Sequence, residues 1–296
     1  MSAPLHARVT RAFRRRGPAV RQIYVSARRA TRFFKDAPRR SAMAALPHVG
    51  LSIPMDAGFL VVPPDQFAEI PGIVADARAA LDRFDASAPS RGKNRKRFLQ
   101  NVLDASTLTL DSAVLRFALR TDVLAMVSRY LGVVPLLSTI TVFYSDTSEG
   151  APTSSQLYHC DGDDITQVKV FIYCTDVTPE SGPLTVLDAA KTRQLQERTD
   201  YQFRDRLSDE KVRKTIGDAT GHPIIGPSGT TAFVDTSRCF HFGSRVALTA
   251  PPRLVTMIQY QTPYSFVIAA DGEESLPFRR LITSSLTPLQ RLVLGE

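Results

Sequence analysis

The sequence predicts a mainly β domain, a sandwich or a barrel, with flanking helices. From Pro135 onward the chain consists of short runs that are rich in β-branched and aromatic residues and are separated by Gly, Pro, Asp and Ser. Strand follows strand, which is typical of an all-β sandwich or barrel and not of alternating βα units. With 296 residues, 43% of them hydrophobic, the chain can bury a sizeable core as one large domain or two small ones.

The segments before Pro135 predict one strand and two helices. Residues 59–62, FLVV, have the composition of a short strand. Asp65 is a candidate cap for a helix whose apolar residues, from Phe67 to Leu81, share one face. A second helix is expected over about 112–131, and Gly132 is expected to end it.

The strands expected after Pro135 are interrupted once by a helical segment. They are the runs LLSTITVFYSD, TQVKVFIYCTDV, GPLTVLD, GTTAFVD and RLVTMIQYQ. Residues 189–214 are long, charged and helix-prone, so we interpret them as an insertion that packs outside the barrel or over its mouth. The basic segment 90–101, SRGKNRKRFLQN, is either a solvated turn or a cover that attracts an anionic substrate.

Positive charge is concentrated at the N-terminus. Residues 1–40 contain 12 Lys and Arg against one acid, a net charge of +11, and the other 256 residues carry 25 bases and 28 acids. Apolar residues recur at helical spacing from Val20 to Phe34, which predicts a basic amphipathic helix. Such a segment can bind nucleic acid, an anionic membrane surface or an acidic partner; it also resembles an organelle transit peptide, and a solvated extension without a partner is the alternative.

This charge asymmetry suggests an N-terminal extension at 1–40 and a catalytic-size domain at 50–296, so we expect a chain without residues 1–40 to stay folded and active. No apolar stretch approaches the roughly 20 residues that span a bilayer, and the N-terminus lacks the apolar run of a secretory signal. Three cysteines are an odd number, which argues against a disulfide framework and for free thiols in a reducing compartment. We expect a cytoplasmic protein, with organelle import through the N-terminal segment left open.

The candidate site begins in the stretch YHCDGDD. His159 and Asp161 are two residues apart, so they lie on the same face of an extended chain, just upstream of an apolar run. A second histidine, His241, follows a Gly-Thr-Thr strand and an Asp-Thr-Ser turn, and Arg253 comes twelve residues later. Two histidines and one carboxylate on one face of an ion leave its other positions open, which suits the chemistry of non-haem Fe(II) and O₂.

These motifs resemble, in order and separation, the phytanoyl-CoA dioxygenase family of Fe(II)/2-oxoglutarate-dependent oxygenases. In that family a His-x-Asp pair precedes an apolar strand and a D-V-x-x-x-x-G-P-L-x-V-L segment. Here these parts read HCD (159–161), KVFIYCTDV (169–177) and ESGPLTVLD (180–188). The distal pattern of the family, a Gly-Thr strand, Asp, His and Gly-Ser, is met by GTTAFVD (229–235) and HFGS (241–244).

The resemblance covers about residues 50–265 and implies a double-stranded β-helix, a cupin-like jelly-roll barrel, with iron in its mouth. It implies that His159, Asp161 and His241 ligate the metal. It also implies that Arg253 receives the distal carboxylate of 2-oxoglutarate, for which a guanidinium is a two-pronged and permanently charged partner.

Three further residues near the implied ligands are candidates to line the cosubstrate pocket: Gln156, Lys169 and Phe171. Core packing is the alternative for Phe171. Many relatives continue with Pro-Gly-Ser-His after the V-L pair, where this chain has residues 188–191, Asp-Ala-Ala-Lys. Because that loop borders the substrate in the family, the substrate of the relatives does not transfer to this chain.

The activity implied by the resemblance is hydroxylation of a small molecule with Fe(II), O₂ and 2-oxoglutarate, releasing succinate and CO₂. Desaturation, cyclisation and epimerisation are alternatives within the same family. An alternative of another class is a non-catalytic jelly-roll binding module whose basic tail grips nucleic acid. In related halogenases a small residue stands at the position of Asp161, so this carboxylate implies oxidation without chloride.

Overall fold

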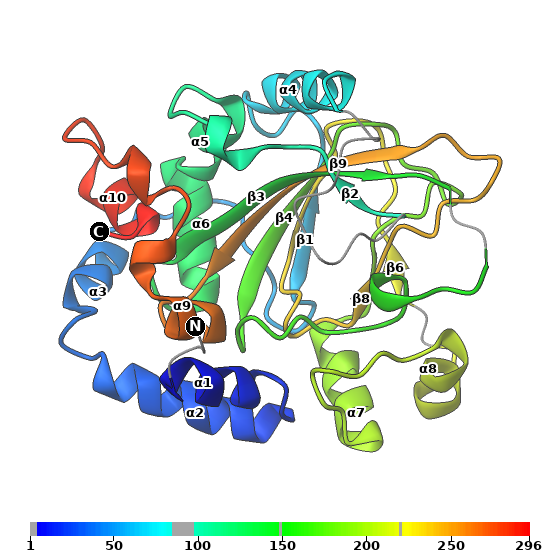
Figure 1. Ribbon diagram of the computed structural model, residues 1–296, viewed down its shortest axis with the longest axis horizontal. Helices are drawn as coiled ribbons and strands as arrows, with labels where there is room; N and C mark the ends of the chain where they lie inside the picture. The colour runs from blue at the N-terminus through cyan, green and yellow to red at the C-terminus, as the bar shows by residue number, and fades with distance from the viewer. Residues whose placement is uncertain (1–4, 85–97, 148–149, 219–220) are drawn as a thin grey trace.

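The computed structural model describes residues 5–84, 98–147, 150–218 and 221–296, and an antiparallel six-stranded sheet lies at its centre (Figure 1). The strand order is β1-β7-β4-β9-β3-β2. These strands are β1 (Phe59–Val62), β2 (Gln100–Asn101), β3 (Leu136–Ser145), β4 (Gln167–Tyr173), β7 (Thr231–Val234) and β9 (Arg253–Gln261). A three-stranded sheet of order β6-β5-β8 contains β5 (Thr185–Val186), β6 (His222–Pro223) and β8 (His241–Phe242). Each of the five strands predicted after Pro135 contains one of these elements.

Strand β9 is the centre of the large sheet. It pairs with β3 along one edge and with β4 along the other, and every one of its nine residues is buried. Although it is buried on both faces, the strand is not uniformly apolar, and the side-chain amides of Gln259 and Gln261 donate to Gln167 Oε1. The first residue of this strand is Arg253, so the strand places a charged side chain at its end.

Helices cover one face of the large sheet (Figure 1). They are α4 (Ile70–Asp82), α5 (Ala113–Ala118), α6 (Thr121–Leu131), α9 (Phe266–Asp271) and α10 (Pro288–Leu294). Their apolar side chains share one core with the strands, in which Phe117 and Leu124 of the helices join Val170 and Ile258 of the sheet. This core fixes the sheet whose other face carries the candidate site.

The two predicted helices differ from the observed ones at their boundaries. Helix α4 begins at Ile70, with Glu69 and not Asp65 at its N-cap position, because a proline in its first turn favours a start there. The helix expected over 112–131 is two helices, since Arg120 has extended backbone angles and its guanidinium is held by Glu69 and Asp122. Gly132 ends the second helix in the left-handed conformation, as predicted.

The fold class was predicted only in part. The antiparallel sheets with flanking helices are present, but the described strands form two separate sheets and not a closed barrel. Helices occupy more of the described chain than strands do, so the protein is not mainly β. The physical reason is that the large sheet needs apolar cover, which segments on both sides of the strand region supply.

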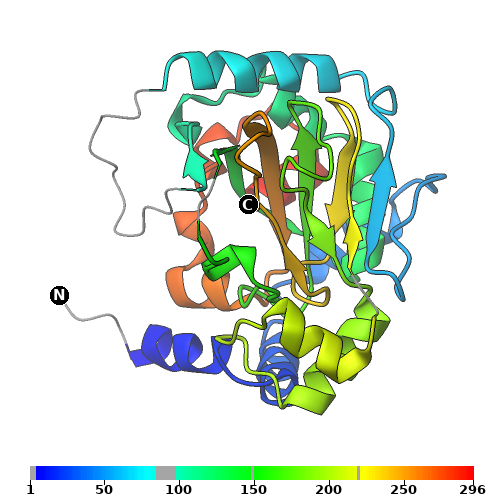
Figure 2. The same ribbon diagram turned by 90° about the vertical axis from the view of Figure 1, so that its right-hand side faces the viewer.

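The N-terminal segment forms three helices, α1 (Leu5–Arg14), α2 (Pro18–Thr31) and α3 (Ala37–Ala44), which pack along one edge of the molecule (Figures 1 and 2). Arg21 is fully buried, and its guanidinium donates to the carbonyl oxygens of Gly162 and Asp164. Arg39 donates to the carbonyl oxygens of Val134 and Pro135. The boundary between an extension and a domain stays a prediction, but residues 5–44 are in contact with the body.

Residues 189–214 contain most of two helices, α7 (Ala189–Thr199) and α8 (Asp209–Ile216), which lie outside the sheets in Figure 1. Leu195 and Val212 of these helices pack in one cluster with Tyr158, Cys160 and Phe240. The helices therefore lie against the segments that precede and follow the candidate ligands. In the described part of the chain, no helix has the length and apolar character needed to span a membrane.

Candidate metal centre

Three side chains from two distant segments converge at one point. The backbones of His159 and His241 exchange two hydrogen bonds, from the His159 N–H to the His241 carbonyl (3.1 Å) and from the His241 N–H to the His159 carbonyl (3.0 Å). The Asp161 N–H donates to the Thr236 carbonyl at 2.8 Å. One ligand atom from each of His159, Asp161 and His241 lies within 4.8 Å of the other two. The predicted triad is thus spatially assembled.

Backbone carbonyls fix the orientation of both imidazoles. Nδ1 of His159 lies 2.9 Å from the Leu157 carbonyl oxygen, and Nδ1 of His241 lies 3.0 Å from the Cys239 carbonyl oxygen. Because a carbonyl only accepts, each Nδ1 carries the hydrogen and each Nε2 keeps a free lone pair. The two Nε2 atoms lie 3.8 and 3.7 Å from the carboxylate oxygens of Asp161. This is the arrangement of histidines that bind a metal through Nε2.

The protonation states suit a cation. Burial and the neighbouring His241 lower the pKa of His159 to about 3, and burial lowers the pKa of His241. Burial alone would raise the pKa of Asp161, but the Lys169 ammonium, 2.8 Å from its Oδ2 atom, and the two imidazoles outweigh it and hold that pKa well below its usual value. At neutral pH the site therefore offers two neutral imidazoles and one carboxylate, which are the forms that bind metals.

The triad lines a cavity of about 210 Å³ that also contains Lys169 and Arg253. Most of the remaining lining is apolar: Leu99, Phe143, Phe171, Leu184, Val255 and Met257. The cavity therefore combines a metal-type donor set, two cations and an apolar wall in one space.

Arg253 is held by neutral groups. Its guanidinium donates to the Gly182 carbonyl and, at 2.9 Å, to Ser244 Oγ. Burial lowers its pKa, and no carboxylate of the described residues compensates its charge. Gly182 has φ +64°, and a Cβ there would meet the backbone nitrogen of Arg245 at 2.6 Å, so only glycine fits where this carbonyl turns to Arg253. A buried guanidinium without an anionic partner can accept one from a ligand.

The three pocket candidates differ in position. Lys169 and Phe171 line the cavity, whereas Gln156 does not belong to its lining. The Gln156 side chain accepts from the Thr153 N–H and donates to the Ser244 carbonyl, so it positions the residue that holds Arg253. Sequence reasoning gave Ser244 no role, although the quoted HFGS motif contains it.

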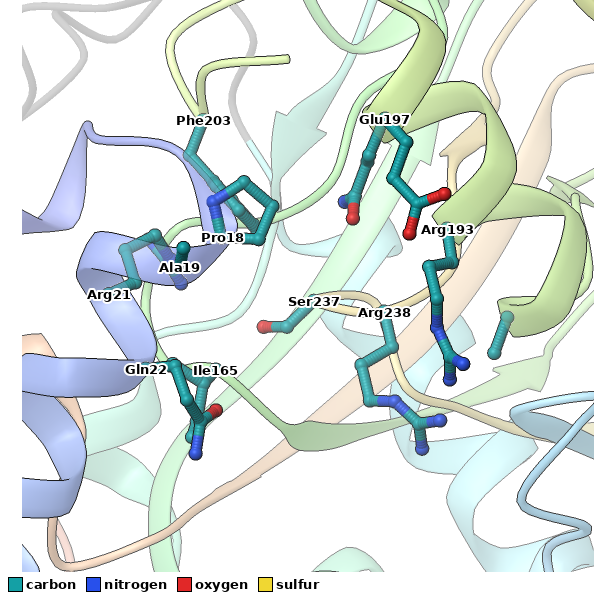
Figure 3. Close-up of a pocket in the computed structure, with 12 residues that line it drawn as sticks. Pro18, Ala19, Arg21, Gln22, Ile165, Arg193, Glu197, Phe203, Ser237 and Arg238 are labelled. Carbon is teal, nitrogen blue, oxygen red and sulfur yellow. The ribbon is translucent and has the colours of Figure 1, made fainter. Parts of the chain in front are cut away.

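A second cavity, of about 390 Å³, lies between α2, α7 and the turn at Ser237 and Arg238 (Figure 3). In this view Arg193 and Glu197 of α7 lie on one side of it, and Pro18, Ala19 and Gln22 of α2 lie on the other. It shares no lining residue with the metal-facing cavity. Gln196, which lines it, lies 3.5 Å from the sulfur of Cys160, the residue between His159 and Asp161 in sequence. The second cavity is thus separate from the candidate centre but adjacent to the loop that carries it.

Comparison with known proteins identifies solved structures with a similar fold but does not assign the chain to a family. No family model matches the sequence, and no curated protein matches it. The apo structure of EctD from S. alaskensis matches with a TM-score of 0.51 and 18% identity over 77% of this chain and 78% of that chain. EctD with 2-oxoglutarate and 5-hydroxyectoine matches with a TM-score of 0.50 and 16% identity over 77% of each chain.

A third solved structure, the epimerase SnoN in complex with Fe3+, alpha ketoglutarate and nogalamycin RO, matches with a TM-score of 0.45 and 19% identity over 70% of this chain and 80% of that chain. A TM-score of this size does not establish a common fold. The similarity to EctD shows that this chain shares its fold, and at these identities the similarity extends no further.

Proposed function

We propose that this protein is an Fe(II)/2-oxoglutarate-dependent oxygenase, related to the phytanoyl-CoA dioxygenase family, that hydroxylates a small molecule and releases succinate and CO₂. One observation carries the proposal: two neutral Nε2 atoms and one charged carboxylate converge in a cavity that also contains a buried, uncompensated guanidinium. EctD, which shares the fold, has been crystallised with 2-oxoglutarate and 5-hydroxyectoine. The donor set and the cation are what such a reaction requires.

Each residue of the cavity has a part in this proposal. The iron, when bound, supplies the activation of O₂ that is coupled to decarboxylation of 2-oxoglutarate. His159, Asp161 and His241 would hold the iron from one side. Lys169 donates a hydrogen bond to Oδ2 of Asp161, and this bond orients the carboxylate. Arg253 would bind the distal carboxylate of 2-oxoglutarate.

The lining of the cavity bears on the substrate. Leu99, Phe143 and Met257 give it an apolar wall, so the part of the substrate near the metal is expected to be a hydrocarbon group. The basic segment 90–101 is the part of the sequence that we connect with an anionic substrate. Its residues 90–97 lie outside the described part of the chain. Its described end contains Leu99, which lines the cavity. An apolar group linked to an anionic one would suit both features.

The proposal is tested by adding Fe(II) and 2-oxoglutarate to the metal-free protein under argon and recording the visible spectrum. A charge-transfer band is expected from the wild type and should be absent from His159→Ala and His241→Ala, whose folding is checked by thermal melting. Release of succinate after admission of air then measures turnover. Metal binding without any spectral response to 2-oxoglutarate would contradict the proposal and favour a binding module.

The rival reactions of the same class are separated by product mass once a substrate is found. Candidate metabolites are screened for stimulation of succinate release. Hydroxylation adds one oxygen atom, desaturation or cyclisation removes two hydrogen atoms, and epimerisation leaves the mass unchanged. A product without added oxygen would contradict the hydroxylase assignment while keeping the iron and 2-oxoglutarate assignment.

A further inference from the structure

The first two N-terminal helices, α1 and α2, are amphipathic, but several of their large apolar side chains face solvent. On α1 the buried residues are Ala7 and Thr10, whereas Leu5, on the opposite side of the helix, is 74% exposed. On α2 the buried residues are Arg21 and Val25, whereas Ile23 is 70% exposed. Val25, Phe13 and Tyr24 pack on the core, but the other large apolar side chains of both helices face solvent, where a surface helix usually has polar residues.

The N-terminal segment contains most of the exposed large apolar side chains of the described residues. Of the ten exposed large hydrophobic residues in the described chain, six lie between positions 5 and 34. They are Leu5, Val9, Val20, Ile23, Phe33 and Phe34. Phe34 is 88% exposed, and its ring meets that of Phe33 edge to face at 5.5 Å. We call these six residues the N-terminal apolar face.

Basic residues surround this face, and exposed acids are absent from the described residues 5–44. The exposed bases are Arg8, Arg11, Arg15, Arg16, Arg29, Lys35 and Arg40. The single acid of the segment, Asp36, is buried and bonded to Arg32. Arg11 pairs with Asp271 and Lys35 with Glu273 of the body, whereas the other five exposed bases belong to no ion pair of the described residues. The surface is therefore apolar and carries an excess of positive charge.

We propose that the N-terminal apolar face docks the protein onto an anionic lipid bilayer. A basic helix with exposed aliphatic and aromatic side chains is the form that lies in the interface of anionic membranes, with its apolar residues among the acyl chains and its arginines at the headgroups. A second copy of the chain would bring like charges together, which is unfavourable. Nucleic acid would pair its phosphates with the arginines but has no apolar surface for the aliphatic side chains. An anionic bilayer matches both the charge and the apolar side chains.

The experiment is sedimentation of the full chain with vesicles of phosphatidylcholine and phosphatidylglycerol in equal parts, compared with pure phosphatidylcholine. Binding to the anionic vesicles is expected. A triple variant, Ile23→Ser with Phe33→Ser and Phe34→Ser, should bind at least tenfold more weakly. The matched control is Met55→Ser with Leu248→Ser, which removes two apolar side chains that are 56% and 63% exposed elsewhere, and it should bind like the wild type.

Four results would overturn this inference. The first is a wild type that stays in the supernatant of the anionic vesicles, and the second is a triple variant that binds as the wild type does. The third is ultracentrifugation that shows a dimer which the triple variant abolishes, because the face would then belong to a second copy. Binding of duplex DNA by the triple variant without vesicle binding by the wild type would assign the segment to nucleic acid. Since all substituted side chains are exposed, melting temperatures should stay unchanged and exclude misfolding.

Discussion

Arg21 links the N-terminal helix α2 to the loop that follows the candidate ligand Asp161. Its guanidinium donates to three carbonyl oxygens, those of Arg14, Gly162 (3.0 Å) and Asp164. Burial lowers its pKa to about 10, so it stays charged at neutral pH. Replacement by methionine keeps the length of an apolar stem and removes all the donors.

The expected loss follows from the three carbonyls left without a donor. An unsatisfied buried acceptor costs about 1–3 kcal/mol, which applies in full to the Asp164 carbonyl and only in part to the partly buried carbonyls of Arg14 and Gly162. The cation also lies over the Phe203 ring at 3.6 Å, a contact worth about 1 kcal/mol or more. Relief of the buried charge of Arg21 offsets part of this sum, so we expect Arg21→Met to lower the free energy of unfolding by about 3 kcal/mol. The unfolding entropy of a 296-residue chain is about 0.6 kcal/mol/K, so this loss corresponds to a fall in melting temperature of about 5 °C.

The assay is urea unfolding and thermal melting of Arg21→Met beside Arg16→Met, whose side chain is exposed and whose loss should change stability by less than about 0.5 kcal/mol. A change below about 1 kcal/mol in Arg21→Met would refute the reasoning that α2 is anchored by this residue. From these contacts we expect that deletion of residues 1–40 destabilises the fold, whereas the sequence alone predicts that the shortened chain stays folded and active.

Three further predictions concern the candidate centre. Arg253→Leu should weaken 2-oxoglutarate binding to the Co(II)-loaded protein about 10- to 150-fold by calorimetry, since a charge-assisted hydrogen bond contributes about 1.5–3 kcal/mol; unchanged affinity would assign the cosubstrate to another base. His159 has a pKa of about 3 in the folded protein instead of 6.5, so between these pH values the unfolded chain binds a proton at this residue and the folded chain does not. The free energy of unfolding of the metal-free protein should therefore fall by up to about 1.4 kcal/mol per pH unit as the pH drops from 6.5 towards 3. Asp164, whose pKa is raised to about 7, changes the stability with pH in the opposite direction. The contribution of His159 is therefore measured as the difference in the free energy of unfolding between the wild type and His159→Gln, followed in urea at each pH. A difference that does not change with pH would contradict the prediction. Asp161→Gly should abolish hydroxylation, and mass spectrometry in chloride buffer should find no chlorinated product from the wild type; retained hydroxylation would remove Asp161 from the ligand set.

The candidate centre could be predicted from sequence because its signals are local. The spacing of two between His159 and Asp161 places both side chains on one face of an extended segment in any fold. His241 and Arg253 were joined to them by the order of motifs in the resembled family, and the structure places both in the same cavity. Gln156 was expected in the lining as a residue of a strand near the ligands, but it is the last residue of a short 3-10 helix, Ser154–Gln156. Its amide instead bonds to Thr153 and Ser244, a consequence of tertiary contacts that spacing does not show.

The predictions of a closed barrel and of a single helix over 112–131 are wrong because both features are decided by long-range interactions. Strand composition shows which segments are extended but not which edges pair, so it does not distinguish two sheets from a barrel. The helix breaks where Arg120 is held by Glu69, a partner 51 positions away. Local helix propensity contains no information on such an ion pair, and the tertiary contact overrides it.

The N-terminal segment shows why charge and periodicity do not reveal which face of a helix is buried. Its spacing correctly predicts α2, and its charge suggests a separate extension, since arginine is seldom fully buried. An arginine can nevertheless be buried where several backbone carbonyls need donors, because one guanidinium carries five N–H groups. The turn after Asp161 leaves such carbonyls at Gly162 and Asp164, and Arg21 satisfies both. Arg21 therefore supports the loop of the candidate centre, and because its side of α2 faces inward, Ile23 on the opposite side of that helix faces solvent.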